Sequence, residues 1–186
     1  MNTQAYLILL CWVVFLVVWL VSAINTKRYA RRNMNSLFMR LVIVVIVSVF
    51  FSSKTVQAIF VGAQQSIATP PVQWLGVVLC VLGMALAIWA RVYLGRNWGM
   101  PMSLKQEAEL VTTGPYAYVR HPIYSGFMLA ALGSALVSVW WFVPLVLFSI
   151  YFIYSAKTEE KIMLKEFPDQ YPGYMKRTNM LIPFVL

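Results

Sequence analysis

The sequence has little charge for its length. Of its 186 residues, 11% are charged and 61% are hydrophobic, whereas about a quarter of the residues in an ordinary soluble domain carry a charge. This composition excludes an ordinary water-soluble domain and indicates an integral membrane protein.

Cysteine and histidine are also scarce. Cys11 and Cys80 are the two cysteines, His121 is the one histidine, and neither cysteine has a second Cys or His at ligand spacing. No disulfide framework and no metal site are therefore predicted, and both cysteines are interpreted as packing residues. The net charge of +9 does not indicate nucleic-acid binding, because Lys and Arg flank apolar runs instead of clustering on a soluble surface.

Long apolar runs are abundant. The first run, residues 6–24, lacks the basic start of a signal peptide and approaches the ~20 residues that a spanning helix needs. Further spans are expected at residues 37–62, 72–94, 123–139 and 140–155. The last two spans would form a tight helical hairpin that turns within residues 138–144.

The predicted fold class is all-α, a polytopic integral membrane protein with about five transmembrane helices. Residues 1–71 are expected to hold two transmembrane helices and their basic connection, and residues 72–186 to hold the functional core. In this arrangement every Lys and Arg except Lys54 lies on one side of the membrane, together with all six acids. The positive-inside rule makes that side cytoplasmic, so the N-terminus is expected outside and the polar chemistry on the cytoplasmic face.

One stretch between two spans, LVTTGPYAYVRHPIYSGFM at residues 110–128, concentrates unusual residue types. Gly114-Pro115 predicts a turn that ends any helix begun at residues 104–111, and Pro122 suits the first turn of a following helix. Arg120 and His121 are thus expected at a helix N-terminus, where anions are favoured. Taken singly, these residues also suit a basic and aromatic belt at the membrane interface.

A second stretch, TEEKIMLKEFPDQYPGYMKR at residues 158–177, follows the last expected span. Glu159 and Glu160 are neighbours about 100° apart on a helix, so at most one is expected to face a given site. An acid pair at the end of a transmembrane helix is costly unless it is paired, and Arg120 and His121 are the expected partners. The aromatic residues that follow suit an amphipathic tail on the membrane surface: Phe167, Tyr171 and Tyr174.

Five motifs resemble, in their order and spacing, those of the isoprenylcysteine carboxyl methyltransferases and the related phospholipid methyltransferases. They are LGRNWG, EAELVTTGPYAYVRHPIYSGFM, TEEKIMLKEF, YPGYMKR and LIPF. The resemblance covers about residues 94–184, half of the chain. It implies a membrane enzyme that transfers a methyl group from S-adenosyl-L-methionine to a lipid-borne or amphipathic small-molecule acceptor among the membrane lipids. It also implies a cytoplasmic cofactor pocket formed by the last helices and the tail, with residues 72–186 as the methyltransferase core.

The resemblance further implies which residues form the site. The cofactor-binding residues would be Ala108, Glu109, Leu110, Val111, Tyr116, Arg120, His121, Pro122, Ile123, Tyr124 and Glu159. The catalytic residues would be His121, Glu159 and Glu160. Methyl transfer to a carboxylate needs no base, whereas an amine acceptor has to lose a proton, which His121 or a glutamate would take.

Two positions depart from the family pattern. Ser155 stands where these methyltransferases commonly carry an arginine suited to an acceptor carboxylate, and Pro168 stands where a glycine is usual. Three interpretations remain open: an isoprenylcysteine carboxyl methyltransferase type acting at a carboxylate, an amine-directed phospholipid (ethanolamine) N-methyltransferase, and a sterol-reductase-like or non-catalytic membrane protein. A reductase would be expected to have more than five spans and a nicotinamide site, so the short chain disfavours a reductase.

Overall fold

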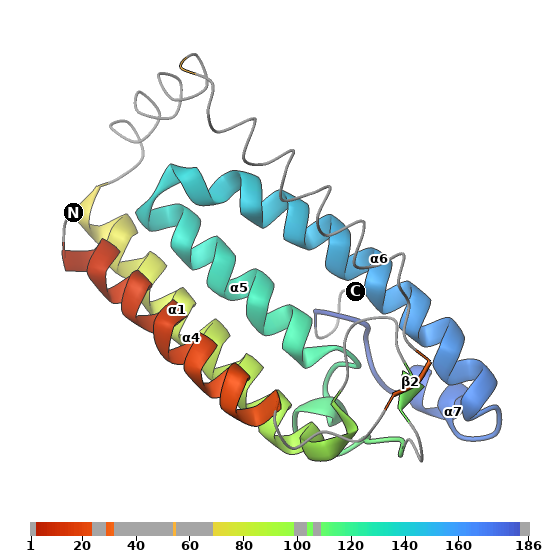
Figure 1. The fold of residues 1–186 in the computed structure, drawn as a ribbon. Helices are drawn as coiled ribbons and strands as arrows, with labels where there is room; N and C mark the ends of the chain where they lie inside the picture. The colour runs from red at the N-terminus through yellow and green to blue at the C-terminus, as the bar shows by residue number, and fades with distance from the viewer. Residues whose placement is uncertain are drawn as a thin grey trace.

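The structure, a computed structural model, describes residues 3–23, 29–31, 54, 69–98, 104–105 and 109–182 (Figure 1). Within these residues four long helices lie side by side: α1 (Thr3–Ala23), α4 (Pro70–Leu94), α5 (Pro122–Val137) and α6 (Phe142–Glu166). Shorter elements connect or follow them: the 3-10 turns η1 (Gly95–Asn97), η2 (Gly114–Ala117) and η3 (Val139–Trp141), and the helix α7 (Tyr171–Met175). Two short antiparallel strands, β1 (Tyr29–Arg31) and β2 (Leu104–Lys105), pair beside the bundle.

The long helices confirm most of the predicted spans. The segments Thr3–Ser22, Pro70–Leu94 and Val139–Glu166 are long and apolar enough to cross a membrane, and Pro122–Val137 is a shorter apolar helix. The predicted second span, residues 37–62, lies outside the described residues, so the total of five remains a prediction. The hairpin turn is shorter than the predicted residues 138–144, because Pro144 lies inside the first turn of α6, where a proline is tolerated.

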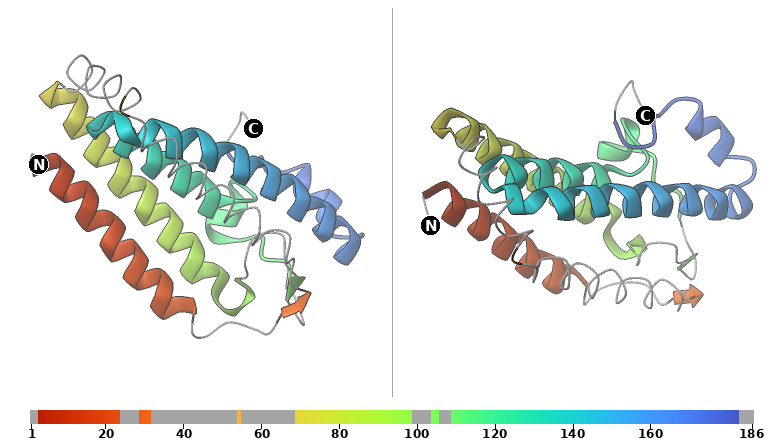
Figure 2. Two further views of the ribbon diagram at one scale, coloured as in Figure 1. Left: turned by 45° about the horizontal axis from the view of Figure 1, so that its top comes forward. Right: turned by 90° about the horizontal axis from the view of Figure 1, so that it is seen from above.

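Helices α1 and α4 run in the same direction, whereas α5 and α6 form an antiparallel hairpin (Figure 2). Near the ends of the parallel pair, the Arg91 guanidinium donates hydrogen bonds to the carbonyl oxygens of Ser22 and, at 3.0 Å, Gly95. The end of α1 and the start of α4 therefore lie at opposite ends of the bundle, which is the arrangement that the predicted second crossing requires.

Glycines hold α4 and α5 close together. A Cβ atom on Gly83 would lie 2.4 Å from the Ala130 nitrogen, and one on Gly133 would lie 2.4 Å from the Gly76 oxygen. Small residues at a membrane helix interface let two backbones approach closely. This contact fixes the start of α5, and with it His121, relative to α4.

The interior of the bundle accounts for residues that the sequence left without a specific role. Cys80 is buried in the apolar core and half-buried Cys11 packs against that core, which confirms that both are packing residues. Arg91, interpreted from the sequence as a flanking charge, is only 2% exposed. Its guanidinium lies 4.5 Å from the centre of the Trp98 ring, a distance suited to cation–π attraction.

Candidate functional site

The start of α5 is held in place by the C-terminal tail, residues 171–182. The backbone N–H groups of Arg120 and His121 donate to the carbonyl oxygens of Asn179 and Met180 at 2.9 and 3.0 Å. One turn into α5, the Ser125 hydroxyl donates to the Leu181 carbonyl oxygen. His121 is the N-cap residue of α5, so the prediction that Arg120 and His121 lie at a helix N-terminus is confirmed.

The loop before α5 turns at Gly114, which has a φ of +60°, in the left-handed region that favours glycine. A Cβ atom there would lie 2.6 Å from the Tyr93 ring. The turn carries Tyr116 inward, where its hydroxyl donates to the Ala90 carbonyl oxygen at 3.4 Å and its own carbonyl accepts from the Tyr174 hydroxyl at 2.6 Å. Burial raises the pKa of Tyr116, so this phenol stays protonated.

The polar side chains at the start of α5 meet those at the end of α6 in one charge cluster: Arg120, His121, Tyr124, Glu159 and Glu160. Arg120 Nε donates to Glu160 Oε1 at 2.6 Å, and the Tyr124 hydroxyl donates to Glu159 Oε1 at 2.5 Å. His121 Nδ1 lies 3.4 Å from Glu159 Oε2, and His121 Nε2 lies 3.6 Å from Glu160 Oε1. The prediction that the acid pair meets Arg120 and His121 is confirmed.

The prediction that at most one of the two acids faces the site is wrong. The imidazole of His121 has a nitrogen on each of two edges, and each nitrogen faces a different carboxylate. Flexible glutamate side chains can therefore reach one ring from backbone positions that point about 100° apart. Both acids belong to the same cluster.

Burial makes the charge balance of this cluster important. The side chains of Arg120 and Glu160 are 10% and 12% exposed, and that of His121 is 10% exposed. Buried charges are tolerated when they are paired, and protonated His121 with Arg120 balances the two carboxylates. Burial alone lowers the pKa of His121, but the contacts with Glu159 and Glu160 and their negative charges outweigh burial and hold that pKa above its ordinary value of 6.5.

The tail is part of this site. Its aromatic residues also suited a tail on the membrane surface, but Tyr171 and Tyr174 are only 2% and 4% exposed, because the tail folds back onto Arg120. Arg120 Nη1 donates to the carbonyl oxygens of Thr178 and, at 3.3 Å, Met175. Burial raises the pKa of Tyr174 to about 12. The available signal was the spacing of the two tyrosines, which places them on the same face of α7.

The other predicted site residues differ in their burial and in their contacts. Ile123 is buried with Tyr116 and Tyr124 in one apolar cluster, against which Val111 packs. Buried Pro122 opens α5 and Leu110 is half-buried. Glu109 is exposed and accepts a hydrogen bond from Asn97 Nδ2 at 3.4 Å, while Ala108 lies outside the described residues. In the described part of the chain, no group of three or more His, Cys, Asp or Glu residues is placed to hold a metal ion.

Two buried polar atoms near the acids lack a hydrogen-bond partner among the described residues: His121 Nε2 and Ser155 Oγ. Ser155 is completely buried and precedes Glu159 by one helical turn, so the two side chains share a face of α6. Buried polar atoms are normally hydrogen-bonded. These two atoms are therefore positions where the polar groups of a bound molecule would be accommodated.

We expect His121 to titrate above 6.5, because the two carboxylates stabilise its protonated form. A raised pKa in the folded state stabilises the fold fully below the unfolded value near 6.5, and this contribution is lost as the pH rises through the folded value. NMR of isotope-labelled histidine measures the midpoint directly, because the chain has one histidine. Glu159→Gln should lower the midpoint; a wild-type midpoint below 6.5 would contradict the assigned charge balance.

Comparison with known proteins shows that this chain is similar to methyltransferases. The model of the phospholipid methyltransferase family matches residues 72–170. A protein-S-isoprenylcysteine O-methyltransferase from Schizosaccharomyces pombe is 37% identical over 58% of this chain and 47% of its own length. A methanethiol S-methyltransferase from Pseudomonas deceptionensis is 34% identical over 37% of this chain and 26% of its own length.

Among solved structures, the eukaryotic intramembrane Ras methyltransferase ICMT (isoprenylcysteine carboxyl methyltransferase) shares the fold, with a TM-score of 0.57 and 23% identity over 83% of this chain and 55% of that chain. The likeness confirms a helical, integral membrane fold. The chain spans about half the length of the isoprenylcysteine methyltransferase relatives it matches. These relatives confirm the resemblance of the motifs to the isoprenylcysteine carboxyl methyltransferases. Because the family model covers more than half of the sequence, this chain belongs to the phospholipid methyltransferase family.

Proposed function

We propose that this protein is a membrane methyltransferase of the isoprenylcysteine carboxyl type that uses S-adenosyl-L-methionine and methylates a carboxylate on a lipid-borne or amphipathic acceptor. The observation that carries the proposal is the buried charge cluster, in which Arg120 and His121 face Glu159 and Glu160 at the end of a membrane-spanning helix. Residues 72–186, which include the family match, would form the methyltransferase core.

The chemistry of the cluster fits this cofactor. S-adenosyl-L-methionine carries a carboxylate, an amino group, hydroxyl groups and a sulfonium, and when bound it supplies the activated methyl group. Arg120 and the N-terminus of α5 would favour the carboxylate, and Glu159 would accept from an amino or hydroxyl group. His121 Nε2, buried and without a hydrogen-bond partner in the described chain, is a position for a further polar contact. The Tyr124 ring, which stacks on Phe152 at 4.6 Å, would lie near the cation.

The ionisation of the cluster favours a carboxylate acceptor. The two carboxylates raise the pKa of His121 and so favour its protonated form, and a protonated imidazole cannot remove a proton from an amine. A carboxylate attacks the methyl carbon without losing a proton. The enzyme's residues then need only to align the acceptor with the donor and exclude water. The name of the Schizosaccharomyces pombe relative also specifies methylation at oxygen.

We place the site at the cytoplasmic face, with the N-terminus outside. The basic residues support this orientation, because all but Lys54 lie at one side of the predicted spans. The charge cluster lies at that side, since it joins the start of α5 to the end of α6.

Ser155 supports a second candidate, an amine-directed phospholipid N-methyltransferase. Its side chain is uncharged and completely buried one turn before Glu159, so this position offers no cation to an acceptor carboxylate. The name of the family model that matches the chain also specifies methylation of a phospholipid. In this alternative one of the two glutamates would take the proton from the amine.

Cofactor binding tests the shared part of both candidates. Calorimetry in detergent should detect binding of S-adenosylhomocysteine, and His121→Ala and Glu159→Ala should each weaken it while the protein still inserts into the membrane. Loss of a charged hydrogen-bond partner costs about 1.5–3 kcal/mol, which corresponds to roughly tenfold or more in affinity. Lys161→Ala, on the exposed side of α6, is the matched control. Unchanged binding in both site variants would refute the assigned pocket, and no binding by the wild type would refute both methyltransferase candidates.

The acceptor is tested by incubating membranes with methyl-labelled S-adenosyl-L-methionine and treating the products with mild alkali. A carboxyl methyl ester releases volatile labelled methanol, whereas a methylated amine retains its label. The proposed function predicts volatile label that depends on Glu159. Label that comes from the lipid fraction and stays non-volatile after alkali treatment would support the second candidate instead.

A further inference from the structure

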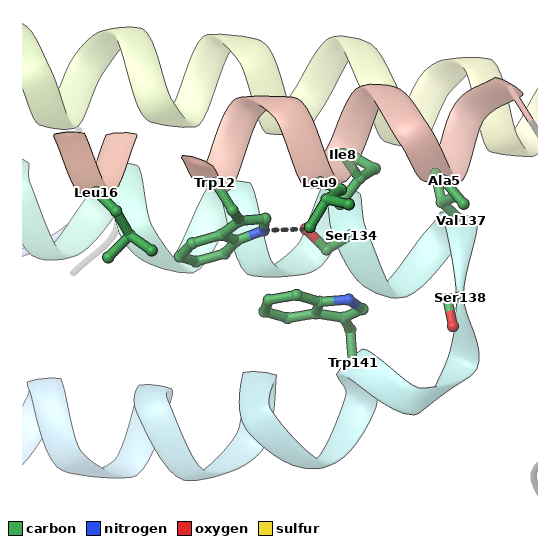
Figure 3. Close-up of a pocket in the computed structure, with 9 residues that line it drawn as sticks. All are labelled: Ala5, Ile8, Leu9, Trp12, Leu16, Ser134, Val137, Ser138 and Trp141. Atoms are coloured by element: carbon green, nitrogen blue, oxygen red, sulfur yellow. Dashed lines mark hydrogen bonds between the residues drawn. The ribbon is translucent and has the colours of Figure 1, made fainter. Parts of the chain in front are cut away.

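A second feature of the bundle lies far from the charge cluster. A cavity of about 460 Å³ opens between α1, the end of α5 and the turn into α6 (Figure 3). The stretch of α5 from Pro122 to Ser134 is about 18 Å long at 1.5 Å per residue, and Ser134 lines the cavity whereas Pro122 adjoins the cluster. The cavity is therefore separate from the proposed methyltransferase site.

The wall of this cavity is mostly apolar, and the polar groups of Trp12 and Ser134 are already hydrogen-bonded. Trp12 Nε1 donates to Ser134 Oγ at 3.1 Å, and Ser134 Oγ donates to the Ala130 carbonyl oxygen at 2.8 Å. The rings of Trp12 and Trp141 stack with their centres 4.8 Å apart, and Figure 3 shows them one over the other between α1 and the turn into α6. A molecule bound here gains contacts with hydrocarbon and aromatic surface, so a hydrocarbon ligand fits better than a polar one.

The shape of the cavity follows one face of α1. Its lining residues Ala5, Leu9, Trp12 and Leu16 recur at the spacing of one helix face. From Ala5 to Leu16 this face is about 16 Å long, which is about half of the ~30 Å hydrocarbon core of a bilayer. The cavity thus begins near the membrane surface where α1 starts and ends near the middle of the membrane.

Among the described residues, the outer edge of the cavity is apolar and exposed. Helix α1 is a membrane span of which only 11% is buried inside the described protein, and Leu9 and Leu16 at the edge of the cavity are 52% and 53% exposed. A space of this volume inside a packed protein would forfeit many dispersion contacts if it stayed empty. The surrounding lipid can fill it from the side.

We propose that this cavity is a binding site for one acyl chain of a membrane phospholipid, from the leaflet opposite to the charge cluster. The depth of one leaflet, the apolar wall and the satisfied polar groups together select this occupant. The bound chain packs between α1 and the turn Ser138 to Trp141, and so stabilises α1 against the rest of the bundle.

Site-specific cross-linking tests this inference independently of the methyltransferase activity. A photo-reactive diazirine analogue of leucine replaces Leu16, and the protein is reconstituted in phosphatidylcholine nanodiscs and irradiated. The control carries the same analogue at Leu82, which is 55% exposed at a similar depth on α4. Intact mass measurement should give severalfold more single-phospholipid adduct at position 16 than at position 82.

A second variant tests whether the adduct arises inside the cavity. Leu9→Trp fills part of the space and should reduce the adduct at position 16, whereas Val78→Trp on the exposed side of α4 should leave it unchanged. Equal adduct yields at positions 16 and 82 would mean that position 16 contacts only the bulk lipid around the protein, and would overturn the proposal. A cross-link from position 16 to another segment of this chain or to a second copy would also overturn it.

Discussion

The ion pair between Arg120 and Glu160 is the interaction on which the polar end of this protein depends. It joins Arg120, in the loop before α5, to the last turns of α6. The same guanidinium donates to carbonyl oxygens of the tail. Breaking a buried ion pair leaves an uncompensated charge, which costs about 3–5 kcal/mol. One side chain thereby fixes the relative positions of a loop, a membrane helix and the C-terminal segment.

The rest of the fold presents this cluster at one end of an apolar bundle. Close packing of glycines between α4 and α5 sets where the first turn of α5 begins, and Arg91 secures the adjacent end of α1. At the other end, α1, α5 and the turn into α6 line a cavity with no charged side chain in its lining. The chain thus separates a polar site near one membrane surface from hydrocarbon contacts near the other, which suits the proposed transfer of a methyl group from a charged cofactor to a lipid-borne acceptor.

Local sequence features predicted the secondary-structure elements well, but they predicted the contacts between these elements less well. Apolar runs predicted the spans, and Pro122 predicted the start of α5, because both signals depend on neighbouring residues. The burial of Tyr171 and Tyr174 and the convergence of both acids on His121 were not predicted. The tyrosines are buried because the tail returns to a loop more than fifty positions earlier. The acids converge on His121 because the hairpin brings the end of α6 beside the start of α5. Such long-range contacts have no local pattern. The pairing of the acids with Arg120 was predicted from charge alone, since a buried carboxylate needs a partner.

Hydrogen–deuterium exchange of residues 171–182 in detergent tests the central role of Arg120 most directly. Arg120→Gln removes the charge that ties the tail to α6, whereas Lys157→Gln removes an exposed charge from the same end of α6. The tail peptides should lose protection in Arg120→Gln and keep it in Lys157→Gln. Wild-type protection of the tail in Arg120→Gln would contradict the account.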